Sequence, residues 1–298
     1  MKKNLLSLLV LSSLGAKAQT IIFQDSFETY TNFAISGVGA WTLTDLDLLT
    51  TYGIEQGTPP VSVMFANSGA PMAYIVMNST ASTPALGAAW VAKTGAKCMA
   101  AMAEIPAGAV TANNDYLISP QIQLGTAGNT LKFWAKAITI TYPEKFKVLV
   151  STTGTAPANF TAITPAAGVS PAAAWVEYTY DINAYQGQNV YIAIQCVSVD
   201  AFALLIDAFK VTATALGTAD FFKSNFTVYP NPSNNVINIS NTNSLEITSA
   251  SITDVNGRIV KEVNSSVESI NISELNAGVY FLKIKTIDGE GFTKIVKN

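Results

Sequence analysis

The sequence predicts an all-β protein made of two sandwiches, and three observations lead to this prediction. Apolar residues make up 49% of the 298-residue chain, which is enough to bury a core. The apolar residues fall in short runs rich in Val, Ile, Tyr, Phe and Trp, broken by Gly, Pro, Asn and Thr, as is typical of strands. No long stretch keeps the 3.6-residue apolar period of an amphipathic helix.

The first unit extends from about residue 19 to 214. Eight or more short strands with irregular loops imply a sandwich, because two packed sheets each bury one face. An Ala-rich stretch at 85–112 has room for a short helix, but its Gly and Pro content favours strands and loops. The clearest expected strands are 131–140, 146–154, 175–182, 190–199 and 202–211.

A second, smaller β unit is expected over 226–298, after a linker at 215–225 that shows no β alternation. Its expected strands are 237–240, 249–257, 258–263, 278–286 and 291–297. Asn256-Gly257 predicts a two-residue hairpin turn, because both residue types tolerate positive φ. Asp288-Gly289 marks another turn.

Residues 1–18 have the three parts of a secretory signal peptide. Lys2 and Lys3 precede an apolar segment too short to span a bilayer, and a small-x-small motif ends the segment. We predict cleavage between Ala18 and Gln19. No later run is apolar and long enough for a transmembrane helix.

Charge and composition exclude several function classes. Residues 19–220 carry 7 bases and 13 acids, a net charge of −6, without the basic stripe that nucleic-acid binding needs. The chain has no histidine, which excludes Ser-His-Asp and Cys-His catalysis and His-ligated zinc. Cys98 and Cys196 both lie in apolar runs, compatible with a disulfide or with two separate buried thiols.

Four blocks of the second unit occur in a fixed order. Tyr229-Pro230-Asn231-Pro232 comes first, residues 252–258 contain Asn256 and Gly257, residues 275–281 contain Gly278 and Tyr280, and Lys294 to Lys297 follow. Proline cannot donate to a β ladder, so the first block suits a stiff strand entry. Together the blocks resemble the type A C-terminal sorting domain of cargo of the Bacteroidota type IX secretion system. The resemblance implies an Ig-like sandwich, export through the periplasm to the cell surface or medium, and contact with the secretion machinery and its sorting peptidase. It also implies either release or anchoring to surface lipopolysaccharide.

The first unit carries a second resemblance. Its blocks are Asp25 to Glu28, residues 41–47, residues 115–120, residues 131–135, residues 181–188 and residues 205–207. They look like those of the cleaved-adhesin or choice-of-anchor J domain, a MAM-like jelly roll. The expected architecture is therefore a jelly-roll β-sandwich followed by a small Ig-like sorting domain.

Candidate ligands for a structural calcium ion follow from this resemblance. It implies that carboxylates from the first and last strands, Glu28 and Asp207, meet on a calcium ion together with Asp25, Asp45 or Asp47. The chain departs from the family pattern at Ala208, where a further oxygen ligand is common. Solvated or turn-capping carboxylates are the alternative interpretation.

Tryptophans supply the candidates for ligand contact. Trp41 and Trp90 lie in looser context than Trp134 and Trp175, and are the better candidates for stacking on a ligand, although core packing is the usual role of each. For a carboxylate-pair hydrolase, Glu55, Glu104, Glu144 and Glu177 are candidates by residue type alone.

These observations favour a non-enzymatic, adhesin-like protein at the cell surface that binds a glycan or a host or matrix protein. The first alternative is a structural or matrix protein without a discrete ligand. The second alternative is a carboxylate-based glycan hydrolase.

Overall fold

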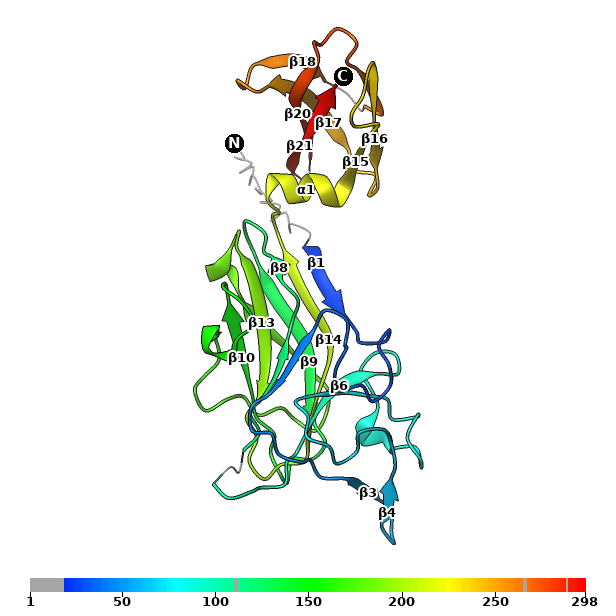
Figure 1. Cartoon of the computed structure of the whole chain (residues 1–298), viewed down its shortest axis with the longest axis vertical. Coiled ribbons are helices and arrows are strands. Elements are labelled where there is room, and N and C mark those ends of the chain that lie inside the picture. The colour runs from blue at the N-terminus through cyan, green and yellow to red at the C-terminus, as the bar shows by residue number, and fades with distance from the viewer. Residues whose placement is uncertain (1–18, 110–111, 265–266, 288) are drawn as a thin grey trace, which may run out of the picture.

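The computed structural model describes residues 19–109, 112–264, 267–287 and 289–298. Figure 1 shows a larger β unit, which ends with strand β14, and a smaller β unit joined to it through helix α1. The predicted all-β architecture is confirmed. The signal peptide and the Ala18 side of the predicted cleavage site lie outside the described residues.

The first sheet of the larger unit is organised around one long strand, β14 (Ala203–Ala213). One edge of β14 pairs with β9, while the other edge pairs with β6 near residues 203–206 and with β1 near residues 209–213. Edge strands β12 and β5 complete the sheet. The other bounds are β1 (Thr20–Asp25), β5 (Ile75–Met77), β6 (Cys98–Met102), β9 (Thr130–Ala137) and β12 (Val176–Asp181).

The second sheet is also antiparallel and is centred on β13, which pairs with β10 on one edge and with β7 and β8 on the other. Its members are β2 (Thr42–Asp45), β7 (Asp115–Ile118), β8 (Ile122–Gln123), β10 (Phe146–Ser151), β11 (Thr161–Ala162) and β13 (Asn189–Cys196). The two sheets bury a shared core that includes Phe133, Phe146, Ile192, Leu204 and Ile206. The long apolar runs of the sequence thus become the facing strands of a sandwich.

A second apolar cluster covers the outer face of the first sheet. It contains Ile54, Trp90, Met77 and Leu205, and is closed by the segment that holds β3 (Ile54–Gln56), β4 (Val61–Val63) and the 3₁₀ turn Ala88–Trp90. The β3–β4 hairpin lies at the end of the larger unit remote from the smaller one (Figure 1). Cys98 and Cys196 are both buried free thiols, so this pair forms two separate buried thiols and not a disulfide.

The smaller unit packs a three-stranded sheet, β15-β16-β19, against a four-stranded sheet, β18-β17-β20-β21. Alternate residues of β20, Tyr280, Leu282 and Ile284, point into its core. The bounds are β15 (Phe226–Tyr229), β16 (Val236–Asn241), β17 (Ile247–Asp254), β18 (Ile259–Val263), β19 (Ser269–Asn271), β20 (Gly278–Thr286) and β21 (Glu290–Lys297).

The segment after β15 docks on the edge of β21 through an asparagine side chain. Asn231 donates from Nδ2 to the carbonyl of Lys294 at 2.9 Å and accepts from the amide of Val296 at 2.9 Å. Pro230 and Pro232 have no backbone N–H, so the side-chain amide of Asn231 takes the place of a strand partner. Gly278 pairs with Lys297 at the start of β20, which brings the four blocks of the sequence into one sheet system.

The turn at Asn256-Gly257 is longer than predicted. Only Gly257 has a positive φ, and Asp254 and Arg258 close the loop by a backbone hydrogen bond of 3.0 Å. The Asp254 carboxylate accepts from the amides of Asn256 and Arg258, which holds Asn256 in a turn conformation with negative φ. The result is a three-residue loop with a bulge in place of the two-residue turn. The Asp288-Gly289 turn includes a residue outside the described ones.

The predicted linker at 215–225 contains helix α1 (Thr218–Asn225), which packs into the smaller unit. Phe221 and Phe222 join its apolar core and stack near Phe226. At Gly291 of β21 an added Cβ would lie only 2.6 Å from the Phe222 amide nitrogen, so glycine permits the close approach of helix and strand. The connection left between the units is therefore about three residues, and the amides of Thr126 and Ala127 bind the carbonyl of its first residue, Ala215.

This packing makes α1 part of the stability of the smaller unit. We expect Phe222→Ala to cost about 3–5 kcal/mol of unfolding free energy, because it leaves a cavity in that core. Lys223→Ala, at an exposed position of the same helix, should change it by less than about 0.5 kcal/mol. Urea unfolding of residues 218–298 measures both values, and equal effects would contradict the placement of α1.

Candidate functional site

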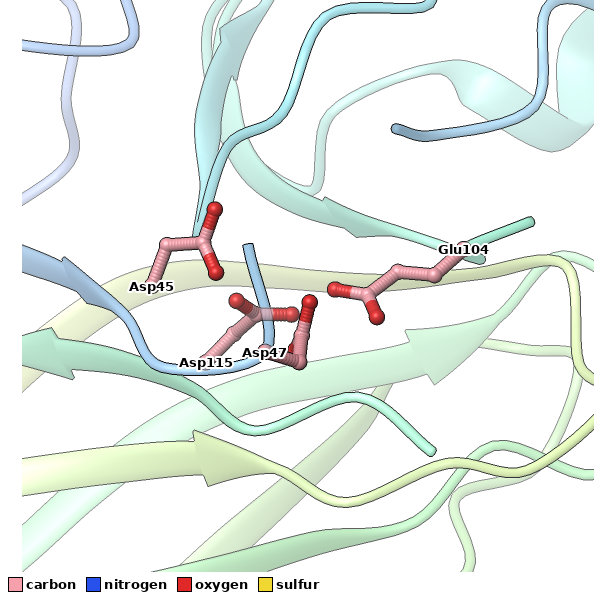
Figure 2. A group of neighbouring side chains, drawn as sticks. All are labelled: Asp45, Asp47, Glu104 and Asp115. Atoms are coloured by element: carbon pink, nitrogen blue, oxygen red, sulfur yellow. The ribbon is translucent and has the colours of Figure 1, made fainter. Parts of the chain in front are cut away.

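Four carboxylates from two sheets meet at the end of the larger unit remote from α1. Asp45 ends β2 and is paired across the sheet with Asp115, which begins β7. Asp47 follows β2, and Glu104 follows β6, where it bridges to Thr51. One carboxylate oxygen of each residue lies within 4.8 Å of the corresponding oxygens of the other three. Figure 2 shows the side chains converging, with Glu104 entering from the opposite side to the aspartates. We call this group the acidic cluster.

Local backbone amides fix the aspartates but leave other oxygens without donors. Asp45 accepts from the amide of Leu48 at 2.7 Å, and Asp47 accepts from the amide of Asn114 at 2.7 Å. Both oxygens of Glu104 and Oδ1 of Asp115 are buried and have no hydrogen-bond partner. Glu104 is 7% exposed and Asp115 is fully buried, so the cluster presents unpaired carboxylate oxygens to an enclosed space.

Burial and repulsion by nearby carboxylates raise the pKa values of Glu104, Asp115 and Asp45. Desolvation, followed by the nearby carboxylates of Asp47 and Asp115, raises the pKa of Glu104 to about 11. Desolvation is also the main cause that raises the pKa of Asp115 to about 8, and it raises the pKa of Asp45. The cluster therefore favours binding of a positive charge, either a proton or a cation.

The five predicted calcium ligands do not come together as one set. Asp45 and Asp47 belong to the acidic cluster, whereas Asp25, Glu28 and Asp207 lie elsewhere. Glu28 accepts from the amides of Ala96 and Lys97, and Asp207 accepts from the amide of Thr94 at 2.8 Å. Asp25 accepts from Trp41 Nε1 at 2.8 Å. These three carboxylates fasten loops through protein donors.

Sequence reasoning missed Glu104 and Asp115. The family resemblance pointed to Asp45 and Asp47, whereas Glu104 and Asp115 reach the same place only through strand pairing across the fold. A usable signal was present at Asp115, since an acidic residue opens a strand whose four residues are all buried. A buried acid of that kind requires a partner.

An open pocket of about 690 Å³ lies beside the acidic cluster. Its floor consists of the buried side chains of Ile54, Val63 and Met102. Its rim contains Tyr52, Met64, Tyr142 and Phe202, all exposed, together with Glu55, Ser62, Ser68 and Asp200. We call this the distal pocket.

The walls of the distal pocket are tied to the acidic cluster. The Tyr52 amide donates to Ala103, and the Ile105 amide donates to Thr50, so residues 50–52 run antiparallel to residues 103–105 on either side of Glu104. Phe202 is held by its carbonyl, which accepts from the Ala103 amide, and by its own amide, which donates to Glu144 at 2.7 Å. Glu144 is buried and also accepts from Ser198 Oγ. One wall of the distal pocket, at Tyr52 and Ala103, is therefore built on the same strand pair that holds Glu104.

Both tryptophans proposed for ligand contact are core residues. Trp41 is 6% exposed and packs against Phe23, Phe27 and Phe209. Trp90 is 5% exposed and packs beside Phe202. The exposed rings of the distal pocket therefore belong to Tyr52, Tyr142 and Phe202, and not to tryptophans.

The glutamates considered for hydrolysis are dispersed. Glu55 lies at the rim of the distal pocket, Glu104 in the acidic cluster, and Glu144 beneath the 198–202 loop. Glu177 of β12 forms an ion pair with Lys132 of the neighbouring strand β9 in the first sheet, at 3.1 Å. Of these four, only Glu55 lines the pocket.

Comparison with known families identifies both β units of the chain. Residues 227–298 match the Secretion system C-terminal sorting domain, and residues 77–211 match the Cleaved Adhesin Domain. Both resemblances stated from the sequence are confirmed. The protein is a secreted or cell-surface, adhesin-like protein.

Solved structures of similar architecture include two cleaved adhesin domains of Lys-gingipain from Porphyromonas gingivalis. The K3 domain is 20% identical with a TM-score of 0.43, covering 65% of this chain and 99% of that domain. The K1 domain is 21% identical with a TM-score of 0.42, covering 64% and 97%. The CBM22-1 xylan-binding domain of Xyn10C from Paenibacillus barcinonensis is 15% identical with a TM-score of 0.36, covering 68% and 99%.

No curated protein matches the chain. Within the described residues, no helix has the length and apolar character needed to cross a membrane.

The buried carboxyl of Glu144 predicts a pH dependence of stability. Desolvation raises its pKa from an ordinary value of 4.5 to about 7. Between these values the unfolded chain releases the proton and the folded chain keeps it, so the free energy of unfolding falls as pH rises from about 4.5 to 7. Relative to Glu144→Gln, the wild type should lose up to about 3 kcal/mol over this interval. Parallel stability curves for the two proteins in urea would contradict the prediction.

Proposed function

We propose that this protein is a non-enzymatic surface adhesin that binds its ligand in the distal pocket. The observation that carries the proposal is the grouping of four exposed large side chains, Tyr52, Met64, Tyr142 and Phe202, around a buried apolar floor. Exposed apolar groups of this kind in a recess mark binding sites. Adhesin-like character and export follow from the two family matches.

The two alternatives have weaker support. A structural protein without a ligand is expected to present flat, Ser- and Thr-covered surfaces, whereas this end of the molecule is recessed and aromatic. A carboxylate hydrolase needs two carboxyls at catalytic spacing in a cleft with an activated acid. Burial shifts the pKa values of Glu104 and Glu144, but both lie outside the pocket lining, where Glu55 and Asp200 are exposed.

We further propose that the acidic cluster holds a calcium ion. Calcium takes six to eight oxygen ligands, and four carboxylates offer up to eight. The unpaired, buried oxygens of Glu104 and Asp115 support this assignment, because such groups are costly without a cation. The ion would fix the 45–51 and 103–105 segments and so hold one wall of the distal pocket. We also propose that the sorting domain contacts the sorting peptidase during export. The exported protein is then either released or anchored to surface lipopolysaccharide.

The pocket assignment is tested by an array of glycans, proteins and peptides probed with the protein from Gln19 to Asn298. We expect Tyr52→Ser and Tyr142→Ser to weaken at least one ligand about tenfold or more, through loss of aromatic contact area. Tyr229→Ser is the matched control, since Tyr52 and Tyr229 are 50% and 52% exposed. Ligands that bind all three variants equally would place adhesion elsewhere on the molecule.

The calcium assignment is tested by thermal unfolding of the same protein after EDTA treatment. Calcium at about 100 times its Kd should stabilise the fold by about 2.7 kcal/mol. Asp115→Asn should remove this response without loss of stability in EDTA, because it relieves repulsion among the carboxylates. Glu28→Gln should keep the response. If Glu28→Gln removed the response and Asp115→Asn kept it, the calcium site would instead lie between Glu28 and Asp207. A wild-type protein that does not respond to EDTA would exclude calcium binding at both sites.

A further inference from the structure

We propose that the ligand of the distal pocket is a polypeptide segment in which an apolar side chain lies next to lysine or arginine. The inference rests on the proposed function, since it names the class of ligand for the same pocket. Three properties of the surface support it: the apolar floor, an apolar rim that extends beyond the pocket, and a one-sided charge.

The floor suits an apolar side chain. Ile54 and Val63 are 2% exposed and Met102 is 3% exposed, so only small parts of their apolar surfaces face the recess. Met64 stands at the rim with 65% exposure, and an unbranched thioether adapts to side chains of different shape. An aliphatic or aromatic anchor that enters this space loses water mainly against the exposed rim side chains Tyr52, Met64, Tyr142 and Phe202, and this loss of water is the main source of affinity in such recesses.

The rim continues outward as an apolar surface. Val61, Ile105, Ile140 and Val199 are each at least 42% exposed, and each lies within two residues of a residue that lines the pocket. Exposed apolar side chains around a recess are typical of a surface that contacts another polypeptide. A small polar ligand would fill the recess and leave this rim in water.

The charge around the pocket is negative. Glu55 and Asp200 are exposed at its rim, and no lysine or arginine is among the described residues that line it. Residues 19–220 as a whole carry a formal net charge of −6 when every carboxyl is counted as ionised. A cationic partner is therefore attracted, whereas an acidic segment is repelled on approach.

A neutral glycan fits these properties less well. Sugar hydroxyls need hydrogen-bond partners when they are buried. The rim of the pocket offers sugar hydroxyls the four hydroxyls of Tyr52, Ser62, Ser68 and Tyr142 and the carboxylate acceptors of Glu55 and Asp200, whereas the floor offers only apolar groups. A peptide keeps its polar backbone at the rim and places only its apolar side chain against the floor.

The test uses three fluorescein-labelled octapeptides in which leucine and phenylalanine alternate with lysine, serine or glutamate. Fluorescence anisotropy with the protein from Gln19 to Asn298 should rank their affinities as lysine above serine above glutamate. Raising NaCl from 50 to 300 mM should weaken the lysine peptide several-fold, because salt screens exposed charges. The double variant Glu55→Gln and Asp200→Asn should lower its affinity roughly five-fold and remove most of the salt effect.

Matched controls separate this proposal from the pocket assignment. The double variant Glu246→Gln and Glu268→Gln, which removes two exposed acids of the smaller unit, should leave the affinity unchanged. Tyr142→Ser should weaken the lysine and serine peptides alike. If neutral oligosaccharides bind in a Tyr142-dependent way and none of the peptides does, the ligand class is wrong and the pocket assignment stands. If the peptides bind without dependence on Tyr142, Glu55 or Asp200, the proposal is overturned.

Discussion

The hydrogen-bonded pairing of β14 with three other strands is the constraint on which the larger unit depends. One edge of β14 pairs with β9, and the other edge changes partner from β6 to β1 at the irregularity after Asp207. Ala208 adopts a positive φ there, and the Asp207 carboxylate binds the amide of Thr94 beside it. The bulge lets two short strands share one edge. The chain leaves β14 at Ala213 and enters α1 at Thr218, so the register of the first sheet also sets the position at which the second unit begins.

Electrostatics governs the opposite end of that unit. Pairing of β2 with β7 brings Asp45 opposite Asp115, and the antiparallel contact of residues 50–52 with 103–105 brings Glu104 to the same place. Four carboxylates held this closely repel one another unless a proton or a cation intervenes. Backbone pairing thus brings together carboxylates that repel one another. A proton or cation that removes this repulsion would hold the adjoining loops, and with them one wall of the distal pocket, more firmly.

The sequence was sufficient for the features that are local in the chain. Runs such as 146–154 and 202–211 predicted β10 and β14, and the four blocks of the second unit identified the sorting domain. Features that depend on contacts between distant residues were missed. Glu104 meets Asp115 only through the pairing of strands. Trp41 is buried against Phe209 of β14, which is far from it in the sequence. Helix α1 is held by its close packing on β21 at Gly291. The turn at Asn256 was misjudged because the Asp254 side chain competes for the same amides.

The docking of Asn231 on β21 has a consequence for biosynthesis. Strand β21, which receives Asn231, also pairs with β20 and packs against α1. It therefore contributes both to the four-stranded sheet and to the packing of the helix, which we call the two halves of the smaller unit. A ribosome must therefore translate β21 before either half can reach its native packing, whereas the larger unit is complete some eighty codons earlier. The segment that marks the protein for export therefore needs its strand β21 both to complete its four-stranded sheet and to dock Asn231.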